Sequence, residues 1–321
     1  MKAIFCEQHG APRDLVLRTI DSPPPPGEGD VKVAVRARGL SFVDVLQIAG
    51  QYQVQPDLPF IPGSEGAGEI IEVGARVDRF EVGDRVLLNG GCVEEVVAPA
   101  SRVTPLPDNV DFETGAAFRA NYTTALYALQ RGQLQAGETL LVHGAAGGVG
   151  LATVDVGKLM GATVIGTAST EAKLEVVRRM GADHVINYTD GFREQVKDLT
   201  AGRGADVTLD PVGGDVFDES MRCIARYGRI LIVGFTGGRP ALAKTNHLLI
   251  KDASAIGLTI GALSRHDPAW ADRNFRILLG WLQAGRITPH YSHCLPLERT
   301  AEALELITGR QVMGKAVVVS P

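Results

Sequence analysis

Cysteine is scarce in this sequence, which has only four cysteines in 321 residues. Cys6, Cys92, Cys223 and Cys294 lie far apart along the chain and form no C-x-x-C pair. Closely spaced cysteines are the usual sign of a disulfide framework or of a structural zinc site. Neither feature is therefore indicated by the sequence.

Long apolar runs and an excess of positive charge are also lacking. No segment reaches the roughly 18 apolar residues of a membrane-spanning helix, and the N-terminal MKAIFCEQHG has no apolar signal-peptide core. Lysine and arginine number 32 against 37 acidic residues, a formal net charge of −5, which argues against a polyanion as the main partner. We expect a cytoplasmic protein without a membrane or nucleic-acid partner.

Hydrophobic residues make up 45% of the chain, enough for a large core and consistent with two domains. Residues 1–120 carry short apolar runs divided by glycine and proline, which indicates a β-rich domain. In residues 121–262 predicted strands alternate with helices, the pattern of a doubly wound Rossmann sheet. Residues 263–321 hold a connecting helix and a tail that would return to the first domain. The predicted fold class is α/β.

The clearest local pattern lies between Thr139 and Ala168. Thr139–His143 reads as a strand buried on both faces, Gly148–Met160 as a helix, and Ala162–Ala168 as a second buried strand. Gly161 is a natural end for the helix between them. Strand, glycine turn, helix and strand together predict a right-handed βαβ unit.

The turn inside this unit has the composition of a phosphate-binding site. Ala145, Gly147 and Gly150 occupy the places of the G-x-G-x-x-G fingerprint, with alanine replacing the first glycine. A phosphate reaches backbone amides at a helix N-terminus only where side chains are missing. A simple packing turn is the alternative, but the position after a strand and before a helix favours a dinucleotide.

The end of the second strand favours NADPH over NADH. An NAD site would have a carboxylate there to bind the ribose 2′-OH, whereas this strand ends in T-A-S. Ser169 can donate a hydrogen bond, and Lys173 can place its ammonium near a 2′-phosphate. Ser169 or Thr170 as a helix N-cap and Lys173 as a solvated charge are the alternatives, and Glu171 weakens the prediction.

A later strand, Arg229–Phe235, also bears on the cofactor. Ligands of doubly wound sheets bind beyond the carboxyl ends of the strands. Val233, Gly234 and Phe235 end this strand, so we expect them to line the nicotinamide half of the dinucleotide.

Four motifs give the chain a family resemblance. With the turn GAAGGVG, the segments LPFIPGSEGAGEIIEVG and VGDRV and the closing GKAVV, it resembles the zinc-free NADPH:quinone oxidoreductase branch of the medium-chain dehydrogenase/reductase superfamily. The resemblance covers essentially the whole chain. It implies a GroES-like β-barrel catalytic domain, a Rossmann domain, and a C-terminal segment that returns to the first.

The zinc ligands of related dehydrogenases have no counterparts. Zinc-dependent relatives place a cysteine three residues before an aspartate and a histidine within G-H-E, whereas this chain has Ser41 before Asp44 and Ser64 before Glu65. Cysteine and histidine are the usual zinc ligands. We expect no bound metal and no alcohol oxidation through a metal-bound alkoxide.

The resemblance also implies roles for individual residues. Ser169, Lys173 and Tyr188 would surround the 2′-phosphate. The pyrophosphate would lie at the turn residues Ala146, Gly147, Gly148 and Val149. Phe42, Thr123, Phe235 and Lys315 would approach the nicotinamide, and Tyr52 and Asp44 would face the substrate cleft. Asp44 is equally open to interpretation as a helix-capping carboxylate.

The expected reaction is hydride transfer from NADPH to a quinone or to the β-carbon of an α,β-unsaturated carbonyl. Without a metal, hydrogen-bond donors must stabilise the developing oxyanion, and Tyr52 and Asn121 are the candidates, with Asp44 as a further catalytic candidate. An enoyl-CoA reductase of the acryloyl-CoA type is one alternative, with Arg119, Arg265 and Arg273 as phosphate contacts.

A non-catalytic NADPH-binding sensor is the alternative of another class, because a fold alone does not prove catalysis. Relatives often dimerise by extending the Rossmann sheet through its last strand. Ser254–Leu258 is apolar enough to be an edge that needs covering. The resemblance therefore implies a homodimer.

Overall fold

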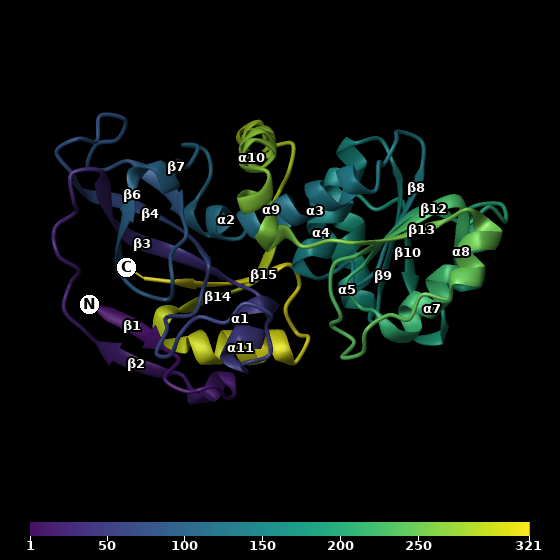
Figure 1. Cartoon of the computed structure of the whole chain (residues 1–321), viewed down its shortest axis with the longest axis horizontal. Coiled ribbons are helices and arrows are strands. Elements are labelled where there is room, and N and C mark those ends of the chain that lie inside the picture. Colours follow the sequence, from purple (N-terminus) through teal and green to yellow (C-terminus); the bar gives the residue numbers. More distant parts are fainter. Residues whose placement is uncertain (321) are drawn as a thin grey trace. The chain divides into compact units, whose positions relative to one another are not determined.

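The computed structural model describes residues 1–320, with the side chains of residues 262, 264 and 265 outside the description. Contacts divide the chain into two compact units. One unit joins Met1–Ala120 to the C-terminal segment that begins at Pro289, and the other is Asn121–Thr288. The chain therefore leaves the first unit once and then returns to it (Figure 1).

The first unit is built on a seven-stranded sheet. Six of its strands follow the order β14-β15-β3-β4-β5-β7, β6 pairs with β3, and β1 and β2 form a separate pair. The strands are β1 (Lys2–Phe5), β2 (Val16–Thr19), β3 (Asp30–Leu40), β4 (Glu65–Val73), β5 (Arg85–Leu88), β6 (Glu95–Pro99), β7 (Thr104–Pro105), β14 (Tyr291–Pro296) and β15 (Lys315–Val319). Because β15 pairs antiparallel with β3, the C-terminal strand completes a sheet that the N-terminal residues begin.

Strand β3 shows why this sheet forms. Val31, Val33 and Val35 are fully buried and pack with Ile70 in one core cluster, because alternate residues of a strand point to the same face. On the opposite face Lys32 pairs with acidic residues of β4 and β6. The helical elements of the unit are α1 (Phe42–Ile48), α2 (Phe112–Ala116), α11 (Thr300–Thr308) and the 3₁₀ turns η1 (Pro12–Asp14), η2 (Ala100–Arg102) and η4 (Leu297–Arg299).

The second unit is a doubly wound parallel sheet, as predicted. Its six strands follow the order β10-β9-β8-β11-β12-β13, and every neighbouring pair is parallel. The strands are β8 (Thr139–Val142), β9 (Thr163–Ala168), β10 (His184–Asn187), β11 (Ala205–Asp210), β12 (Ile224–Ile232) and β13 (Ser254–Gly257). The helices are α3 (Arg119–Arg131), α4 (Gly148–Leu159), α5 (Glu171–Arg179), α6 (Arg193–Leu199), α7 (Gly214–Cys223), α8 (Thr245–Lys251), α9 (Ile260–His266) and α10 (Pro268–Gln283), with the 3₁₀ turn η3 (Tyr188–Asp190).

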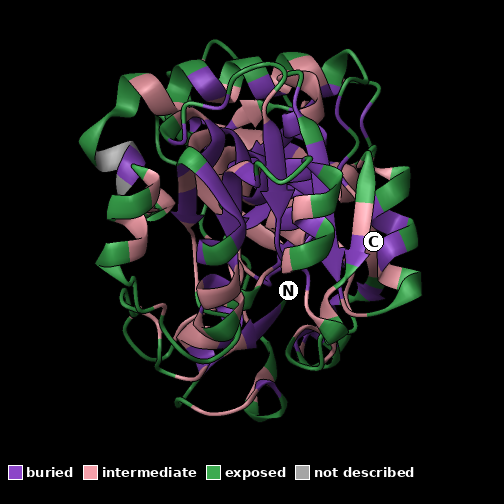
Figure 2. Ribbon diagram, turned by 90° about the vertical axis from the view of Figure 1, so that its right-hand side faces the viewer, coloured by how far each residue is buried: buried purple, intermediate pink, exposed green. Residues whose placement is uncertain are grey.

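The strand order sets the topological switch point of this sheet. The first strand in sequence, β8, lies between β9 and β11, so the connections from β8 and β11 leave toward opposite sides. Such a switch point forms the crevice in which doubly wound sheets bind nucleotides, beyond the carboxyl ends of the strands. Buried residues gather in the strands and exposed residues on the outer helix faces (Figure 2). At the switch point, every residue of β8 and every residue of β11 except Asp206 is buried.

Several boundaries differ from the sequence expectation. The helix expected over Gly191–Thr200 begins at Arg193, because the Glu219 carboxylate accepts hydrogen bonds from the amides of Phe192 and Arg193 and caps it there. Helix α10, expected in a connecting segment, lies in the second unit, whose last residue is Thr288. Among the described residues, no helix combines the length and apolarity needed to cross a bilayer.

Candidate functional site

The turn between β8 and α4 presents open backbone. Gly144 has a φ of +55°, a left-handed conformation that glycine adopts easily. Gly147 is the N-cap residue of α4 and supplies no side-chain cap, and a Cβ built on Gly147 would meet only the Gly144 carbonyl oxygen, at 3.3 Å. The amide of Ala145 donates to the Thr167 carbonyl, 3.0 Å away, which ties the turn to β9. Uncapped amides of the first helical turn are therefore available to an anion.

The remaining glycines of the turn are required by packing. A Cβ on Gly150 would lie 2.7 Å from the Ala145 Cα, so this glycine allows α4 to approach the end of β8 closely. A Cβ on Gly148 would lie 2.6 Å from Nδ2 of Asn121, on α3. The three glycines of the sequence GGVG thus have three different environments: an open backbone face at 147, the side chain of Asn121 at 148, and close helix-to-strand packing at 150.

The carboxyl end of β9 holds the residues predicted to read the 2′ position. Thr170 caps α5 by accepting a hydrogen bond from the Lys173 amide at 3.4 Å, so Ser169 is not the cap. Tyr188 directly follows β10, whose last residue Asn187 pairs with Ala168 at the end of β9. Ser169 and Tyr188 therefore follow paired strand ends.

Glu171, the acid that weakened the NADPH prediction, has an ion pair of its own. Its carboxylate lies 2.5 Å from Nη1 of Arg178, and its side chain is 73% exposed. The end of β9 itself is free of carboxylates over Thr167, Ala168 and Ser169. The arrangement can therefore receive a phosphate without placing a negative side chain on the strand end.

The ends of β11 and β12 are joined by hydrogen bonds. Oδ1 of Asp210 accepts from the amides of Val212 and Gly213, at 2.8 and 2.9 Å. The amide and hydroxyl of Thr236 both donate to the Pro211 carbonyl. Phe235 is 45% exposed. The strand expected over Arg229–Phe235 ends at Ile232. Val233, Gly234 and Phe235 therefore follow β12, in a segment hydrogen-bonded to the end of β11 and the loop after it.

Four buried side-chain polar atoms of the second unit have no hydrogen-bond partner among the described residues. They are Oγ1 of Thr123, a predicted cofactor contact on α3, Oδ2 of Asp210 at the end of β11, Nε of Arg193 and Oγ1 of Thr208. Burial raises the pKa of the Asp210 carboxyl. Unpartnered buried polar atoms are uncommon in folded proteins and often mark ligand sites or bound water.

His143 at the end of β8 is a polar residue that sequence reasoning missed. It is fully buried, with Nδ1 3.0 Å from the Thr167 hydroxyl and Nε2 2.8 Å from the Ser220 hydroxyl. Burial lowers the pKa of His143 to about 3, so the ring is neutral. Because Ser220 donates its proton to the Val216 carbonyl, Nε2 of His143 carries the ring hydrogen and Nδ1 accepts from Thr167.

Asp44 in the first unit has the geometry of a cap. Its Oδ2 accepts from the amide and hydroxyl of Ser41, at 2.7 and 2.8 Å, and its Oδ1 accepts from the Gly63 amide at 3.1 Å. The side chain is 1% exposed. Burial raises the pKa of Asp44, opposed by the hydrogen bonds from Ser41. The carboxyl group therefore fixes the start of α1 against the segment before β4.

Lys315 and Glu65 form a buried ion pair. Their side chains are 2% and 4% exposed, and Oε2 of Glu65 also accepts from the Ala120 amide at 2.9 Å. Lys315 was expected beside the nicotinamide, and the structure places its ammonium against a carboxylate of β4. The ion pair with Glu65 joins β15 to β4, and the two residues are 250 positions apart in the sequence. No local sequence pattern predicts this pair.

The first unit holds the other predicted residues at partly accessible positions. Phe42 begins α1 and is 36% exposed. Tyr52 is half-buried in the segment after α1, where its carbonyl accepts from the Gln55 side chain. Phe42, Asp44, Tyr52 and Lys315 thus belong to the first unit. Asn121, Thr123 and the predicted residues from Ala146 to Phe235 belong to the second.

Serines stand where zinc-dependent relatives have their ligands. The hydroxyl of Ser41 is occupied by Asp44, and Ser64 precedes β4. Over residues 1–320, no group of three or more histidine, cysteine, aspartate or glutamate side chains is arranged to hold a metal ion. The residues at these positions do not fit a tetrahedral zinc site, which is built from cysteine, histidine or carboxylate ligands.

The three arginines considered as phosphate contacts for a CoA substrate lie in different environments. Nη1 of Arg119 donates to Asn89 at 2.9 Å, Arg273 is exposed on α10, and the side chain of Arg265 lies outside the described residues.

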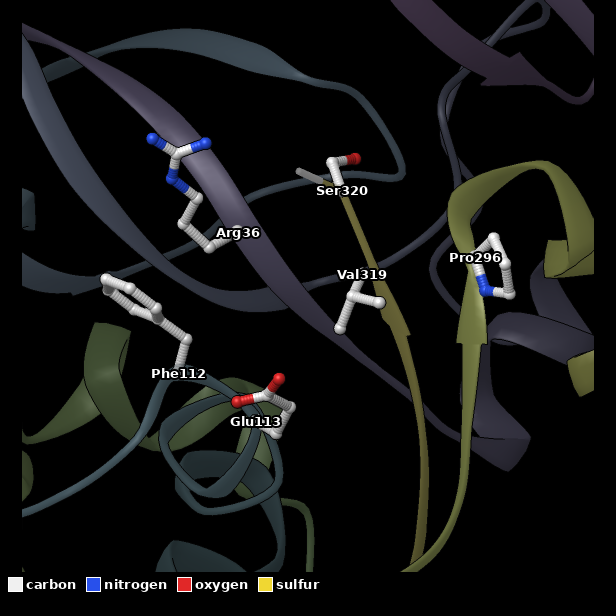
Figure 3. Close-up of a pocket in the computed structure, with 6 residues that line it drawn as sticks. All are labelled: Arg36, Phe112, Glu113, Pro296, Val319 and Ser320. Carbon is white, nitrogen blue, oxygen red and sulfur yellow. The ribbon is translucent and has the colours of Figure 1, made fainter.

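A surface hollow of about 460 Å³ in the first unit is lined by Arg36, Phe112, Glu113, Pro296, Val319 and Ser320 (Figure 3). None of the predicted site residues lines it.

A doubly wound sheet with an open glycine turn, in one chain with a β-rich unit, defines the class of two-domain nucleotide-dependent dehydrogenases and reductases. Residues 27–108 match the family model for the alcohol dehydrogenase GroES-like domain, and residues 148–275 match that for zinc-binding dehydrogenases. The chain belongs to the quinone oxidoreductases of the medium-chain dehydrogenase/reductase superfamily, and is thus an oxidoreductase with the predicted fold class.

Individual relatives support this assignment. The quinone oxidoreductase-like protein 2 homolog of Nematostella vectensis is 40% identical over 325 residues, which cover 99% of this chain and 88% of the relative. The crystal structure of Escherichia coli quinone oxidoreductase complexed with NADPH is similar at a TM-score of 0.89 and 27% identity, over 100% of both chains. Mycobacterial Rv1454c complexed with NADPH is similar at a TM-score of 0.87 and 30% identity, also over 100% of both chains.

Proposed function

We propose that this protein transfers hydride from NADPH to an electron-poor acceptor, a quinone or an α,β-unsaturated carbonyl, without a bound metal. The observation that carries the proposal is the pairing of an uncapped glycine turn with a strand end that offers Ser169 and no carboxylate. Two structural neighbours of this chain are NADPH complexes. NADPH, when bound, supplies the hydride from C4 of its nicotinamide.

The second unit supplies the cofactor contacts in this proposal. The first-turn amides of α4 bind the pyrophosphate at Ala146, Gly147, Gly148 and Val149, where Gly147 leaves the backbone uncovered. Ser169 donates to the 2′-phosphate, and Lys173 and Tyr188 complete this subsite. Thr123, Val233, Gly234 and Phe235 contact the nicotinamide half, and the unpartnered Thr123 hydroxyl fits a ligand that brings a hydrogen-bonding group.

The first unit supplies the groups that act on the acceptor. A metal-free site must stabilise the developing oxyanion with hydrogen-bond donors, and the phenol of Tyr52 is the donor we assign to this role. Phe42 is an accessible apolar wall. Asp44 and Lys315 act indirectly, because both are buried and already bonded within the unit.

One experiment tests the proposal. NADPH and NADH oxidation are measured in parallel against a quinone, an enone and an enoyl-CoA ester, with zinc content determined on the same sample. We expect NADPH to be preferred at least tenfold in kcat/KM, with turnover on the quinone or enone and no dependence on zinc. Turnover that requires stoichiometric zinc, or NADPH binding without oxidation by any acceptor, contradicts it.

The proposed partner is a second copy of the chain. Strand β13 is the edge of its sheet, and the nearby segment of the same unit exposes Leu242 at 71%, Leu249 at 78% and Ile250 at 65%. Unpaired edges and exposed apolar side chains favour association. We expect a dimer by light scattering and a monomer for Leu249→Glu with Ile250→Glu. A wild-type monomer, or a dimeric double variant, would exclude this edge.

A further inference from the structure

The side chain of Asn121 lies against the first residue of the phosphate-binding helix. A Cβ built on Gly148 would lie 2.6 Å from Nδ2, 2.7 Å from Oδ1 and 2.9 Å from Cγ of Asn121. All three distances are below the separation that real Cβ atoms show. Asn121 is only 8% exposed, so its carboxamide has little space to move away. A side chain at position 148 would therefore have to displace the carboxamide of Asn121.

The neighbouring glycine has a different environment. A Cβ on Gly147 would meet only a carbonyl oxygen of the turn, at 3.3 Å, and no side chain within 4 Å. The face of Gly147 is thus open and the face of Gly148 is covered by α3. The absence of a side chain at 147 suits an approaching phosphate, whereas its absence at 148 suits Asn121.

We propose that Asn121 is a positioning residue of the phosphate-binding turn, matched in size to Gly148, and not a donor to the acceptor substrate. Its carboxamide takes the volume that a side chain at 148 would fill and sets how the first turn of α4 packs against α3. This inference rests on the proposed dinucleotide function only in naming the ligand of the turn.

The neutrality of Asn121 belongs to the same proposal. The N-terminus of a helix carries a partial positive charge of roughly half a unit, which attracts the phosphates of a dinucleotide. An aspartate at 121 has the shape of asparagine but would itself interact with this helix end and repel the phosphates. Replacing Asn121 by aspartate should therefore weaken NADPH binding while leaving the ligand-free protein at least as stable.

The test is a double-mutant cycle read out by NADPH binding, with the affinity measured by titration calorimetry, and by the melting temperature without ligand. We expect Gly148→Ala to weaken NADPH binding about tenfold and to lower the melting temperature. Adding Asn121→Ala should restore most of both. Gly147→Ala should also weaken binding, but Asn121→Ala should not restore it. Gly280→Ala on α10, where a Cβ meets nothing within 4 Å, is the matched control and should change neither value.

Asn121→Asp supplies an independent measurement. We expect its NADPH affinity to fall about tenfold at low salt and less at high salt, because screening weakens the repulsion. If Asn121→Asp binds NADPH like the wild type and loses only kcat, Asn121 contacts the acceptor and the proposal is overturned. Failure of Asn121→Ala to restore Gly148→Ala in either readout also overturns it. A failed proposed function appears differently, as NADPH binding without turnover or as no binding by the wild type. The melting-temperature cycle still tests the Asn121–Gly148 pair in both cases.

Discussion

Buried polar groups are treated differently in the two units. In the first, Glu65 pairs with Lys315, Asp44 accepts three hydrogen bonds, and Arg38 donates to backbone carbonyls and to Ser320. In the second, buried atoms such as Oγ1 of Thr123 on α3 and Oδ2 of Asp210 at the end of β11 are left without hydrogen-bond partners among the described residues. Paired groups hold a fold together, whereas unpaired groups and open amides are suited to a ligand. Buried charged groups thus stabilise the first unit, whereas we propose that the polar edge of the second unit binds the ligand.

The largest expected effect comes from breaking the pair between Glu65 and Lys315. Lys315→Met leaves a buried carboxylate unpaired, so we expect the free energy of unfolding to fall by about 3 to 5 kcal/mol. The double variant Glu65→Gln with Lys315→Met should lose much less, because no charge remains uncompensated. Urea unfolding measures both.

The matched control is the exposed pair of Lys2 and Glu298, whose side chains are 47% and 39% exposed. Lys2→Met should lower the free energy of unfolding far less than Lys315→Met does, since water already screens this pair. A Lys315→Met variant as stable as its double variant would show that the buried pair has no structural role.

The next effect is a pH dependence caused by His143. Folded His143 stays neutral down to about pH 3, whereas in the unfolded chain it binds a proton below about pH 6.5. The unfolded state thus binds more protons, and the free energy of unfolding falls by up to about 1.4 kcal/mol per pH unit as pH decreases from 6.5 toward 3. His143→Gln should remove this slope, as seen in unfolding curves from pH 4 to 7.

Exposed His184 provides the control for this slope. His184→Gln should keep the wild-type dependence, because this side chain lies exposed to water and is not enclosed by the fold. Loss of the slope in His143→Gln would show that a buried, fully hydrogen-bonded imidazole of the second unit is a structural group, like the paired buried groups of the first unit. An unchanged slope in His143→Gln would show that the ring is not held neutral.

A smaller effect concerns the binding edge of the second unit. Ser169→Ala and Lys173→Ala would each remove one proposed charge-assisted contact to the 2′-phosphate, so we expect NADPH affinity to fall about tenfold for each. NADH affinity should not change, since NADH lacks this phosphate. Lys251→Ala, at the end of α8, removes a similar charge elsewhere in the unit and should leave the NADPH preference intact. Equal losses for both cofactors would place the contact elsewhere.

An effect of the same size, but confined to turnover, is expected in the first unit, at a residue outside its set of paired buried groups. Tyr52→Phe removes one hydroxyl from a half-buried side chain, and we expect enone reduction to slow about tenfold through loss of proton donation. NADPH affinity and the melting temperature should stay at wild-type values. Steady-state kinetics and binding titrations separate these quantities, and unchanged turnover would remove Tyr52 from the mechanism.

Local sequence patterns predicted much of the fold. The apolar run before GAAGGVG predicted β8, the glycine turn and α4, and the structure confirms a parallel doubly wound sheet around them. The choice between Ser169 and Thr170 as the cap of α5 could not be made from sequence, because both residue types are common helix N-caps. Backbone geometry decided it in favour of Thr170.

Contacts between residues that are far apart in the sequence could not be predicted from it. Neither the His143–Ser220 hydrogen bond nor the Lys315–Glu65 pair follows from spacing or composition, because each depends on how separate elements pack. The roles predicted for Tyr52, Asn121 and Lys173 stay predictions. The position of Asn121 over Gly148 shows why residue type alone was insufficient: an amide can donate to a substrate or fill a space, and only its neighbours distinguish the two.

The sequence by itself determined the strand-turn-helix unit, the serines at the zinc-ligand positions and the family. Each of these can be recognised from residues that are close together in the sequence, and the strand-turn-helix unit also follows from their local conformational preferences. Tertiary structure alone decided which buried polar groups are satisfied and which glycine of the turn faces open space. Those properties depend on side chains brought together from separate elements, where burial removes water and makes every missing partner costly.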